Sequence, residues 1–434
     1  MIEICAVSGY EEVGGNLTAV RVDDDVILLD MGINVEHFIE ASEQNARSAD
    51  ELMHLKAIPN ITLIKDWAKD VKAIIPSHAH LDHIGAIPHL EKKFDAPIMG
   101  TPFTIAVLEQ IAKNEKIVLK NPCKKLRYNK KYQITKNVSV ELIEITHSAP
   151  HAALIVLRTP YGNIVYGNDF KMDHSPTLGL PPDIERMKKL GEEGVKVFLI
   201  DSTRIVEEGR TESEAHAAKK VREAMLKNAE GGLIVSTFSS HIARIRTICE
   251  TAQEMGREVL FMGRSLSKYL LAAKDVGLFD YEPYGELVPY KSMIRKKLKS
   301  IAKNLDKYVL LVTGHQGEPQ AVLSSMIRNQ LPCVIKEGDC VIFSCTVIPT
   351  EANIAQREKL DQLIMEKNIS IEKDVHASGH PRQEDVAEIL SYLKPELVIP
   401  SHCTPEFREE MAKFVESLGY NVKVMRDGER IVVE

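Results

Sequence analysis

The chain has 434 residues with a formal net charge of −7, and 44% of its residues are hydrophobic. This length allows two or three domains, and no apolar run approaches the ~20 residues that span a bilayer. The acidic balance argues against nucleic-acid binding by overall charge. The N-terminus lacks the basic start of a signal peptide, and the seven cysteines are scattered without a CxxC pair. These features predict a cytoplasmic protein with reduced thiols and no membrane partner.

The first predicted element that bears on function is an apolar strand, residues 26–29, which ends at Asp30. We interpret Asp30 as a residue that orients a nearby site, although a simple turn former is an alternative. The following stretch, Ala41 to Trp67, is polar and helix-prone. We expect it to be a solvated insertion, with a lid or a partner surface as alternatives.

A second apolar run, residues 71–77, predicts a buried strand and leads into His78-Ala79-His80-Leu81-Asp82-His83, and we predict a helix from Ile84 onward. This motif places four potential metal ligands within six positions. The two histidines of His-x-His share one side of an extended segment, whereas Asp82 and His83 begin the next turn. The pattern indicates a hydrolase with two metal ions rather than a set of core histidines.

Three more candidate ligands follow predicted strands. His147 comes after residues 138–145, Asp169 ends a hairpin formed by residues 151–157 and 163–166, and His402 follows residues 397–401. Side chains at the ends of distant strands can gather in one cleft. We exclude Cys403 as a ligand, because in an extended segment it points away from its neighbour His402.

More than two hundred residues separate Asp169 from His402, which indicates an inserted domain. Runs at residues 195–200, 233–238, 259–265, 309–319 and 341–344, which we interpret as strands with the residues that follow them, alternate with helical stretches such as His241 to Met255. This alternation predicts a parallel sheet covered by helices. After His402 we expect a helix from Pro405 to Leu418 and a last strand from Asn421 to Met425.

The ligand series resembles the metallo-β-lactamase superfamily, in which His-x-His-x-Asp-His is followed by a lone His, a lone Asp and a C-terminal His. The resemblance implies an αββα sandwich and two metal sites. By position, one site would be held by His78, His80 and His147, the other by Asp82, His83 and His402, with Asp169 bridging them. It implies two Zn²⁺ ions, and Mn²⁺ is also possible at mixed His/Asp sites.

The insertion resembles the β-CASP subgroup, whose members cut nucleic acids. Asp201 matches motif A, His380 motif B and His402 motif C. Gly263-Arg264-Ser265, Thr313 to Pro319 and His376 to His380 look most like ribonuclease J, in its shorter archaeal form. The resemblance implies a metallo-β-lactamase domain in two parts, residues 1–206 and 372–434, around an α/β β-CASP domain at residues 207–371.

That family resemblance implies a metal-dependent ribonuclease acting on single-stranded RNA in decay and maturation, most simply a 5′-to-3′ exonuclease that prefers 5′-monophosphorylated RNA. The catalytic residues would be Asp169, Asp201 and His380, with His380 as the proton donor. His376, Ser378 and Gly379 would bind the 5′ phosphate. The resemblance also suggests a homodimer.

Three alternatives stay open at this point. A β-CASP endoribonuclease for RNA processing shares the same motifs. A thiolesterase-like hydrolase would keep the metal motif but has no reason for the insertion. A non-catalytic RNA-binding protein would be expected to lack some of the seven ligands. Two basic runs, residues 124–131 and 291–303, are candidates for RNA contacts, but most of these cations are interpreted as solvated surface.

Overall fold

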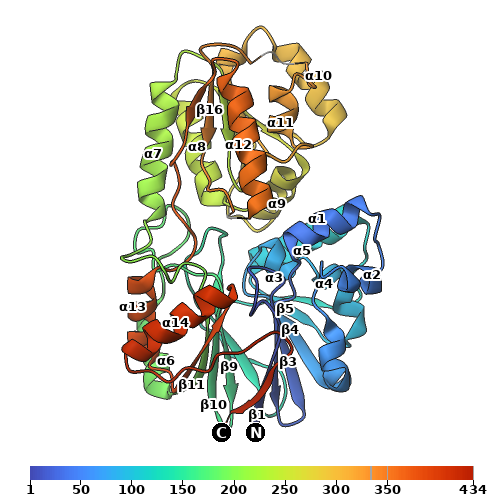
Figure 1. Ribbon diagram of the computed structural model, residues 1–434, viewed down its shortest axis with the longest axis vertical. Helices are drawn as coiled ribbons and strands as arrows, with labels where there is room; N and C mark the ends of the chain where they lie inside the picture. Colours follow the sequence, from blue (N-terminus) through green and yellow to red (C-terminus); the bar gives the residue numbers. More distant parts are fainter. Residues whose placement is uncertain (333–334, 349, 434) are drawn as a thin grey trace. The chain divides into compact units, whose positions relative to one another are not determined.

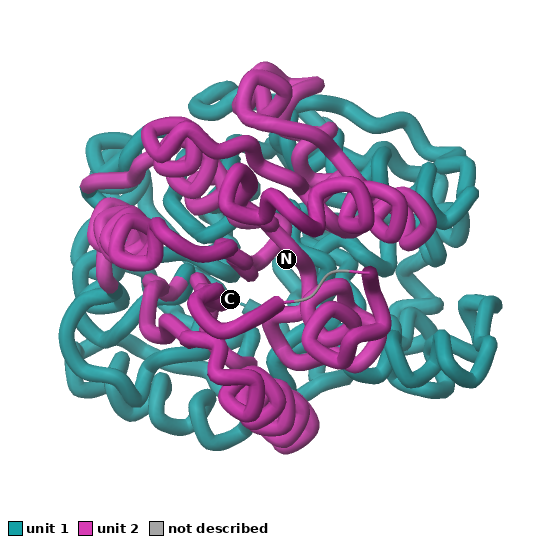
Figure 2. Tube along the Cα trace, turned by 90° about the horizontal axis from the view of Figure 1, so that it is seen from above, with its two compact units in different colours: residues 1–174, 179–211, 379–434 teal, residues 175–178, 212–378 magenta. Residues whose placement is uncertain are grey.

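The computed structural model describes residues 1–332, 335–348 and 350–433, which divide into two compact units. Unit 1 comprises Met1–His174, Gly179–Thr211 and Gly379–Glu434, and unit 2 comprises Ser175–Leu178 and Glu212–Ser378 (Figure 2). The insertion therefore leaves unit 1 after Thr211 and rejoins it at Gly379, whereas the sequence-based bounds were 207 and 371.

Unit 1 contains two sheets. The first has the strand order β19-β1-β2-β3-β4-β5-β6 in the described residues. Its pairings are antiparallel from β19 to β3 and parallel from β3 to β6. The bounds are β1 Ile2–Ser8, β2 Leu17–Val22, β3 Asp25–Leu29, β4 Val71–Ile75, β5 Ile98–Gly100, β6 Cys123–Lys125 and β19 Arg430–Val433.

The second sheet has the order β18-β11-β10-β9-β8-β7 in the described residues. Strands β8, β9 and β10 are antiparallel, which confirms the predicted hairpin, and β10, β11 and β18 are parallel. The bounds are β7 Tyr132–Gln133, β8 Ser139–Glu144, β9 Ala153–Thr159, β10 Gly162–Gly167, β11 Val195–Asp201 and β18 Leu397–Ser401.

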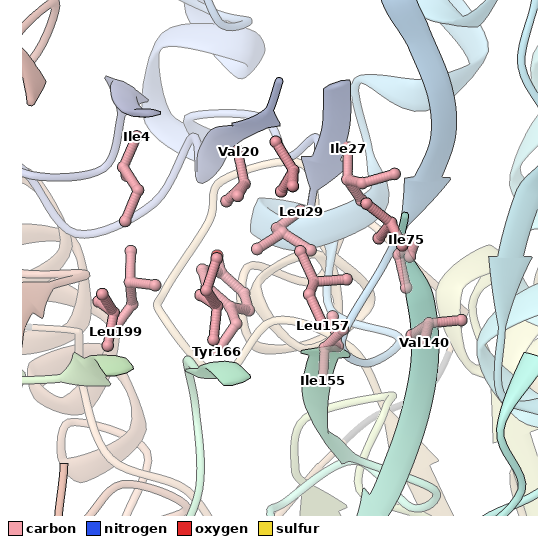
Figure 3. Packing of buried hydrophobic residues seen from close by; sticks show 14 of the residues in the cluster. Ile4, Val20, Ile27, Leu29, Ile75, Val140, Ile155, Leu157, Tyr166 and Leu199 are labelled. Atoms are coloured by element: carbon pink, nitrogen blue, oxygen red, sulfur yellow. The ribbon is translucent and has the colours of Figure 1, made fainter. Parts of the chain in front are cut away.

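The two sheets of unit 1 pack face to face through alternating apolar side chains (Figure 3). Ile27 and Ile75 of the first sheet and Ile155, Leu157 and Tyr166 of the second belong to this shared buried cluster. Burying such side chains contributes about 1.5–3 kcal/mol each. The strand ends are therefore held rigidly, and residues that follow them can be positioned with precision.

Helices cover the outer faces of this sandwich (Figure 1). α6, α13 and α14 pack on the second sheet through a separate apolar cluster, and α5 lies against β5 and β6 of the first. The bounds are α1 Val35–Glu43, α2 Ala49–His54, α3 Leu81–Ile84, α4 Ile87–Leu90, α5 Pro102–Glu115, α6 Ile184–Glu193, α13 Gln383–Leu393 and α14 Pro405–Ser417, with 3-10 turns η1 Ile61–Asp70 and η2 Glu91–Lys93. The predicted αββα sandwich is confirmed.

Unit 2 is built on one sheet with the order β14-β13-β15-β12-β16-β17 in the described residues. Every pairing in it is parallel, as predicted. The assignment of the predicted strand at residues 195–200 to this sheet is wrong, because it is β11 in the second sheet of unit 1. The strands are β12 Leu233–Ser236, β13 Glu258–Met262, β14 Gly285–Val288, β15 Tyr308–Val312, β16 Cys340–Phe343 and β17 Ser370–Glu372. The helices are α7 Glu214–Lys227, α8 Ile242–Glu254, α9 Arg264–Asp275, α10 Lys291–Ile301, α11 Val322–Ile327 and α12 Glu351–Met365, with η3 Leu305–Lys307.

The C-terminal prediction is wrong in one respect. Residues 421–425 form no strand and make only a single bridge, between Val422 and Val398. The last strand is instead β19, which pairs with β1 after the chain turns at Gly428. Met425 is fully buried in the core between the sheets. Residues 421–425 therefore contribute to the core, and the free edge of β1 pairs with β19.

The interpretation of residues 41–67 as a solvated insertion is also wrong in part. Trp67 is 1% exposed, and Leu52 and Ile64 are buried as well. The guanidinium of Arg430, on β19, lies 4.3 Å from the centre of the Trp67 ring and forms a 2.7 Å ion pair with Asp66. The apolar residues of the segment therefore anchor it to the sandwich, while its polar residues face solvent.

Candidate metal centre

The His-x-His-x-Asp-His motif folds into a tight turn after β4. The backbone N–H groups of His83 and Ile84 donate to the carbonyl of His80, at 3.1 and 3.0 Å. The helix therefore begins at Leu81 and Ile84 is its last residue, which corrects the prediction of a helix from Ile84 onward. Because the motif itself closes the turn, Asp82 and His83 face the same side as the preceding histidines.

One group of candidate ligands comprises His78, His80, His147 and Asp169, which could hold one metal ion. His80 Nδ1 lies 2.9 Å from His78 Nε2 and 3.1 Å from His147 Nε2. Asp169 Oδ2 lies 3.5 Å from His78 Nε2 and 3.5 Å from His147 Nε2. Three imidazole nitrogens and one carboxylate oxygen thus face a common point, as a divalent metal requires.

A second group comprises Asp82, His83, Asp169 and His402. Asp169 Oδ2 lies 3.3 Å from His83 Nε2, and Asp169 Oδ1 lies 3.2 Å from His402 Nε2. Asp82 Oδ2 lies 3.4 Å from His83 Nε2. Asp169 belongs to both groups, so the structure brings together all seven residues that the sequence singled out and places this carboxylate between the two sets.

Left-handed backbone conformations occur at three of the strand ends around this centre. Asp30, Asp169 and His402 have φ values of 59°, 61° and 55°, a region that residues other than glycine rarely adopt. Each follows a strand at the same end of the sandwich. Such backbone strain is typical of functional sites.

Hydrogen bonds donated by Nδ1 orient three of the histidines. His147 Nδ1 donates to the carbonyl of Gly379 at 2.7 Å, His83 Nδ1 to Asp30 Oδ2 at 2.7 Å, and His402 Nδ1 to Asn16 Oδ1 at 2.9 Å. These oxygens only accept, so Nδ1 holds the proton. The lone pair of each Nε2 is then directed into the centre, where a metal ion would use it.

Asp30 is confirmed as an orienting residue by its contacts. Its carboxylate accepts hydrogen bonds from Ser77 N at 2.6 Å, Ser77 Oγ at 2.9 Å and Tyr166 OH at 2.9 Å, in addition to His83. Tyr166 itself belongs to the core between the sheets. The orientation of His83 is therefore coupled to the packing of the sandwich.

Asn16 was not identified from the sequence. Its side-chain Nδ2 donates to the carbonyl of Asp82 at 3.0 Å, and this carbonyl can only accept. The amide is therefore turned so that Oδ1 faces His402. A Cβ on Gly9 would lie 2.5 Å from Asn16 Oδ1, so Gly9 leaves the space that Asn16 needs. Asn16 follows two glycines in a loop, and no local pattern in the sequence indicates its role.

Burial and charge explain the electrostatics of the centre. Burial lowers the pKa of His78 and His147 well below the usual range and that of His80 to about 4, and neighbouring imidazoles add to this effect at His78 and His147. Burial opposes ionisation of Asp169, but the nearby histidines outweigh it and hold its pKa well below the usual value. Neutral imidazoles of His78, His80 and His147 beside an ionised carboxylate are the donor set of a divalent cation. At His83 burial opposes protonation, but the charges of Asp169, Asp82 and Asp30 outweigh it and raise the pKa well above the usual value.

The buried Asp169 Oδ1 accepts no hydrogen bond from any described residue. An ionised oxygen that accepts no hydrogen bond is costly to bury. Together with the converging Nε2 atoms, this oxygen fits a metal ion better than it fits a purely structural cluster.

His380 and Asp201 form a pair next to the centre. His380 Nδ1 donates to Asp201 Oδ2 at 2.8 Å, and Asp201 Oδ1 accepts from Thr203 N at 2.9 Å and Thr203 Oγ1 at 2.7 Å. The His380 ring stacks on that of His402, with centres 5.8 Å apart. Burial opposes protonation of His380, but Asp201 and Asp169 raise its pKa to about 9. Thr203 is a further residue that the sequence did not indicate.

The residues expected to bind a 5′ phosphate are divided between the units. Gly379 lies in unit 1, where a Cβ would come within 2.6 Å of the His147 ring. His376 and Ser378 lie in unit 2, where the His376 ring is 6.2 Å from Phe238 and 6.5 Å from His241. The close packing of residue 379 on His147 is by itself a structural reason for a glycine at this position, independent of phosphate binding.

Cys403 is buried and belongs to none of the potential metal groups in the described part of the chain. No helix in that part combines the length and the apolarity needed to cross a membrane.

A sandwich with ligands at its strand ends and an inserted α/β unit is the architecture of the metallo-β-lactamase superfamily with a β-CASP domain. The family model described as "Metallo-beta-lactamase superfamily" matches residues 10–185, and the one described as "Ribonuclease J, beta-CASP domain" matches residues 230–363. The chain is 42% identical to ribonuclease J of Methanocaldococcus jannaschii over 100% of its own length and 99% of that protein. Ribonuclease J of Pyrococcus abyssi is 39% identical, over 97% of this chain and 94% of that protein. The chain therefore belongs to the ribonuclease J family.

Bacterial relatives extend beyond the match. Ribonuclease J of Sinorhizobium meliloti is 33% identical over 80% of this chain but only 60% of that protein. Among solved structures, a protein of unknown function from Enterococcus faecalis has a TM-score of 0.66 at 18% identity, over 99% of both chains. That likeness concerns the fold alone. The fold and the cluster of histidines and aspartates indicate a centre for divalent metal.

Proposed function

We propose that the protein is a metal-dependent ribonuclease that hydrolyses RNA phosphodiester bonds, acting in the 5′-to-3′ direction on RNA with a 5′ monophosphate. The observation that supports this most strongly is the complete centre in unit 1. Two four-residue groups share Asp169, and the His380–Asp201 pair lies beside them. A non-catalytic RNA-binding protein would not need this arrangement of residues.

The donor set suits two Zn²⁺ ions, and Mn²⁺ is the second candidate. His78, His80, His147 and Asp169 would hold one ion, and Asp82, His83, Asp169 and His402 the other. When bound, two such ions activate water and neutralise phosphate oxygens during in-line displacement. The contribution of this chain is to fix the ligands in advance, through Asp30, Asn16 and Gly379.

His380 is the proposed proton donor to the leaving 3′ oxygen. Its Nδ1 is engaged by Asp201, so Nε2 is the atom that can deliver a proton. Asp201 holds the ring in place and stabilises its charged form, while Thr203 fixes Asp201. This chain of contacts defines the ring orientation before RNA binds.

Direction depends on a pocket for the 5′ end, which we propose to include His376, Ser378 and Gly379. Backbone N–H groups in a segment of small residues and a hydroxyl donor can approach a terminal phosphate closely. A monophosphate would be favoured over a hydroxyl, because charge-assisted hydrogen bonds are stronger.

One assay tests the activity and separates the alternatives. RNA with a 5′ monophosphate is labelled at its 5′ end in one sample and at its 3′ end in another, and each is incubated with the zinc-loaded protein. Immediate release of labelled mononucleotide from the first sample only supports the proposal. Internal fragments support an endoribonuclease, and the absence of any product overturns the enzymatic proposal.

Assembly as a homodimer and location in the cytoplasm are further parts of the proposal. Membership of the ribonuclease J family supports both. Sedimentation equilibrium of the purified chain measures the mass of the assembly directly, and the mass of a single chain would contradict the dimer.

A further inference from the structure

The segment from Lys116 to Lys136 in unit 1 has an unusual charge. It contains eight basic residues and no acidic residue, although the whole chain has 55 basic and 62 acidic residues. The basic residues are Lys116, Lys120, Lys124, Lys125, Arg127, Lys130, Lys131 and Lys136, and all of them are exposed. We call residues 116–136 the basic segment.

None of these eight side chains forms an ion pair with another residue in the described ranges. Exposed cations elsewhere are often paired, for example Lys196 with Glu396 and Lys227 with Glu372, both at 2.7 Å. Unpaired cations in one segment repel each other and gather counterions. A polyanion that replaces those counterions gains free energy from their release.

Protection of sheet edges explains only part of this charge. The segment runs from β6, the edge strand of the first sheet, to β7, the edge strand of the second. Lysines on edge strands prevent sheets from joining those of other molecules. However, only Lys124 and Lys125 lie in β6, and β7 consists of Tyr132 and Gln133. The other six basic residues lie outside the strands.

The basic segment lies against the loop that contains His147. Tyr128 donates to the carbonyl of Ala152 at 3.1 Å, and its ring centre is 6.3 Å from that of His151. Ala153, the first residue of β9, donates to the carbonyl of Ser77, beside His78. Within unit 1, the basic segment therefore contacts the loop of His147 directly, and through the neighbouring Ala153 it is linked to the residue before His78.

We propose that the basic segment is a sequence-independent binding surface for the phosphate backbone of single-stranded RNA. This inference rests on the proposed ribonuclease function and adds to it a place where RNA outside the metal centre is held. An acidic protein is the competing partner, but protein interfaces usually need an apolar core. Val118, which is 84% exposed, is the single large apolar side chain that the segment exposes strongly.

Two variants of equal net charge test the proposal. The first replaces Lys124, Lys125 and Lys130 of the basic segment with Gln. The control replaces Lys65, Lys69 and Lys189 with Gln, which are also exposed and form no ion pair within the described residues. The probe is a fluorescent 2′-O-methyl oligouridine of about 20 nucleotides, which resists cleavage and is long enough for several phosphate contacts.

Fluorescence anisotropy gives the association constant of each zinc-loaded protein between about 50 and 200 mM salt. Each lost phosphate contact should reduce the slope of log K against log salt by about 0.7. We expect a reduction of about 2 for the first variant and no change for the control. Equal slopes in the two variants would overturn the proposal, whether RNA binding is retained or lost in both.

Hydrolysis separates this inference from the proposed activity. The first variant should have a raised KM for long RNA, but the same rate as the wild type on a p-nitrophenyl phosphodiester, which is too short to reach the segment. If the wild-type protein hydrolyses no RNA but the two variants differ in slope, only the ribonuclease proposal is contradicted. Hydrolysis of long RNA with an unchanged KM in the first variant contradicts the binding surface alone.

Discussion

At the residue scale, the centre depends on groups that do not touch the metal positions directly. Asn16 fixes the ring of His402, Asp30 fixes His83, and Gly379 fixes His147. The oxygen in each pair determines which imidazole nitrogen has the lone pair. Substitution of such partners usually weakens metal binding without removing a ligand.

Replacement of Asn16 with Ala should weaken zinc binding about 10- to 100-fold, because His402 then loses the acceptor for its Nδ1 proton. Competition with a chromophoric chelator measures this affinity, and the absorption spectrum of the Co²⁺ form reports the changed coordination. The matched control is Asn163→Ala, which removes a buried amide that donates to Gly194 O at 2.7 Å in the same unit. Equal zinc affinity in both variants would contradict the role of Asn16.

Replacement of His380 with Ala should retain the metals and the affinity for RNA but reduce the rate about 10²- to 10⁴-fold, the range for a positioned acid. A p-nitrophenyl phosphodiester, whose leaving group needs no proton, should be affected much less. The exposed His174 supplies the control variant, His174→Ala. Equal losses on the two substrates would remove His380 from the acid role.

At the element scale, α7 and α8 in unit 2 are joined by a buried charge network. Arg244, which is 0% exposed, donates to Glu214 Oε1 at 2.7 Å and Oε2 at 2.8 Å. It also donates to Ser344 Oγ at 2.6 Å and to the carbonyl of Val375 at 3.1 Å. Burial opposes ionisation of Glu214, but His241 and Arg244 outweigh it and hold its pKa well below the usual value.

Replacement of Arg244 with Met should destabilise the protein by about 3–5 kcal/mol, because Glu214 is left buried without its main partner. Urea unfolding monitored by circular dichroism measures this change. Arg246→Met, on the exposed side of the same helix, removes only an i,i+4 pair with Glu250 and should cost less than about 1 kcal/mol. A similar, small cost in both variants would show that the network contributes little.

The turn that precedes β19 should make stability dependent on pH. Burial and the charges of Glu12 and Glu11 raise the pKa of Asp427 to about 6. The folded state then binds more protons than the unfolded state between pH 4 and about 6, so stability falls as pH rises through this window. Asp427→Asn keeps an acceptor for Tyr10 N and should be more stable than the wild type by about 1 kcal/mol above pH 7, but not at pH 4. Thermal unfolding at pH 4 and above pH 7 measures the difference in stability between the variant and the wild type. The same difference at both pH values would contradict the raised pKa of Asp427.

At the scale of the whole molecule, two of the three residues proposed to bind the 5′ phosphate belong to a different unit from the proposed metal centre, and Gly379 is the exception. The proposed ligands and the His380–Asp201 pair lie in unit 1, whereas His376 and Ser378 lie at the end of unit 2. Substitutions in the two sets should therefore have different effects on the reaction.

RNA with a 5′ monophosphate should be degraded faster than RNA with a 5′ triphosphate, which is bulkier, or a 5′ hydroxyl, which forms weaker hydrogen bonds. Ser378→Ala should reduce this preference and leave any internal cutting intact, and Ser391→Ala, in an exposed position of α13, is the control. Rates on the three substrates measure the effect. If the wild type shows no preference among the three 5′ ends and releases no mononucleotides, the proposed exonuclease activity is contradicted.

Much of the fold and of the candidate site could be predicted from the sequence alone. The apolar runs before His78, His147, Asp169 and His402 were all found as strands, because their patterns are local and the buried sheets demand them. Each of these four candidate ligands lies within three residues of the end of its strand. Once the strands are assigned, the convergence of the ligands at one end of the sandwich follows from the fold.

Contacts between residues far apart in the chain were decided only by the tertiary structure. Asn16 and His402 are 386 positions apart, and Gly379 and His147 are 232 apart, so no local pattern records either pair. Likewise, the open edge of β1 selects Arg430–Val433 as the last strand, while Met425 packs in the core. Local hydrophobicity determines which segments become strands, but edge pairing and the orientation of side chains depend on what the folded chain brings beside them.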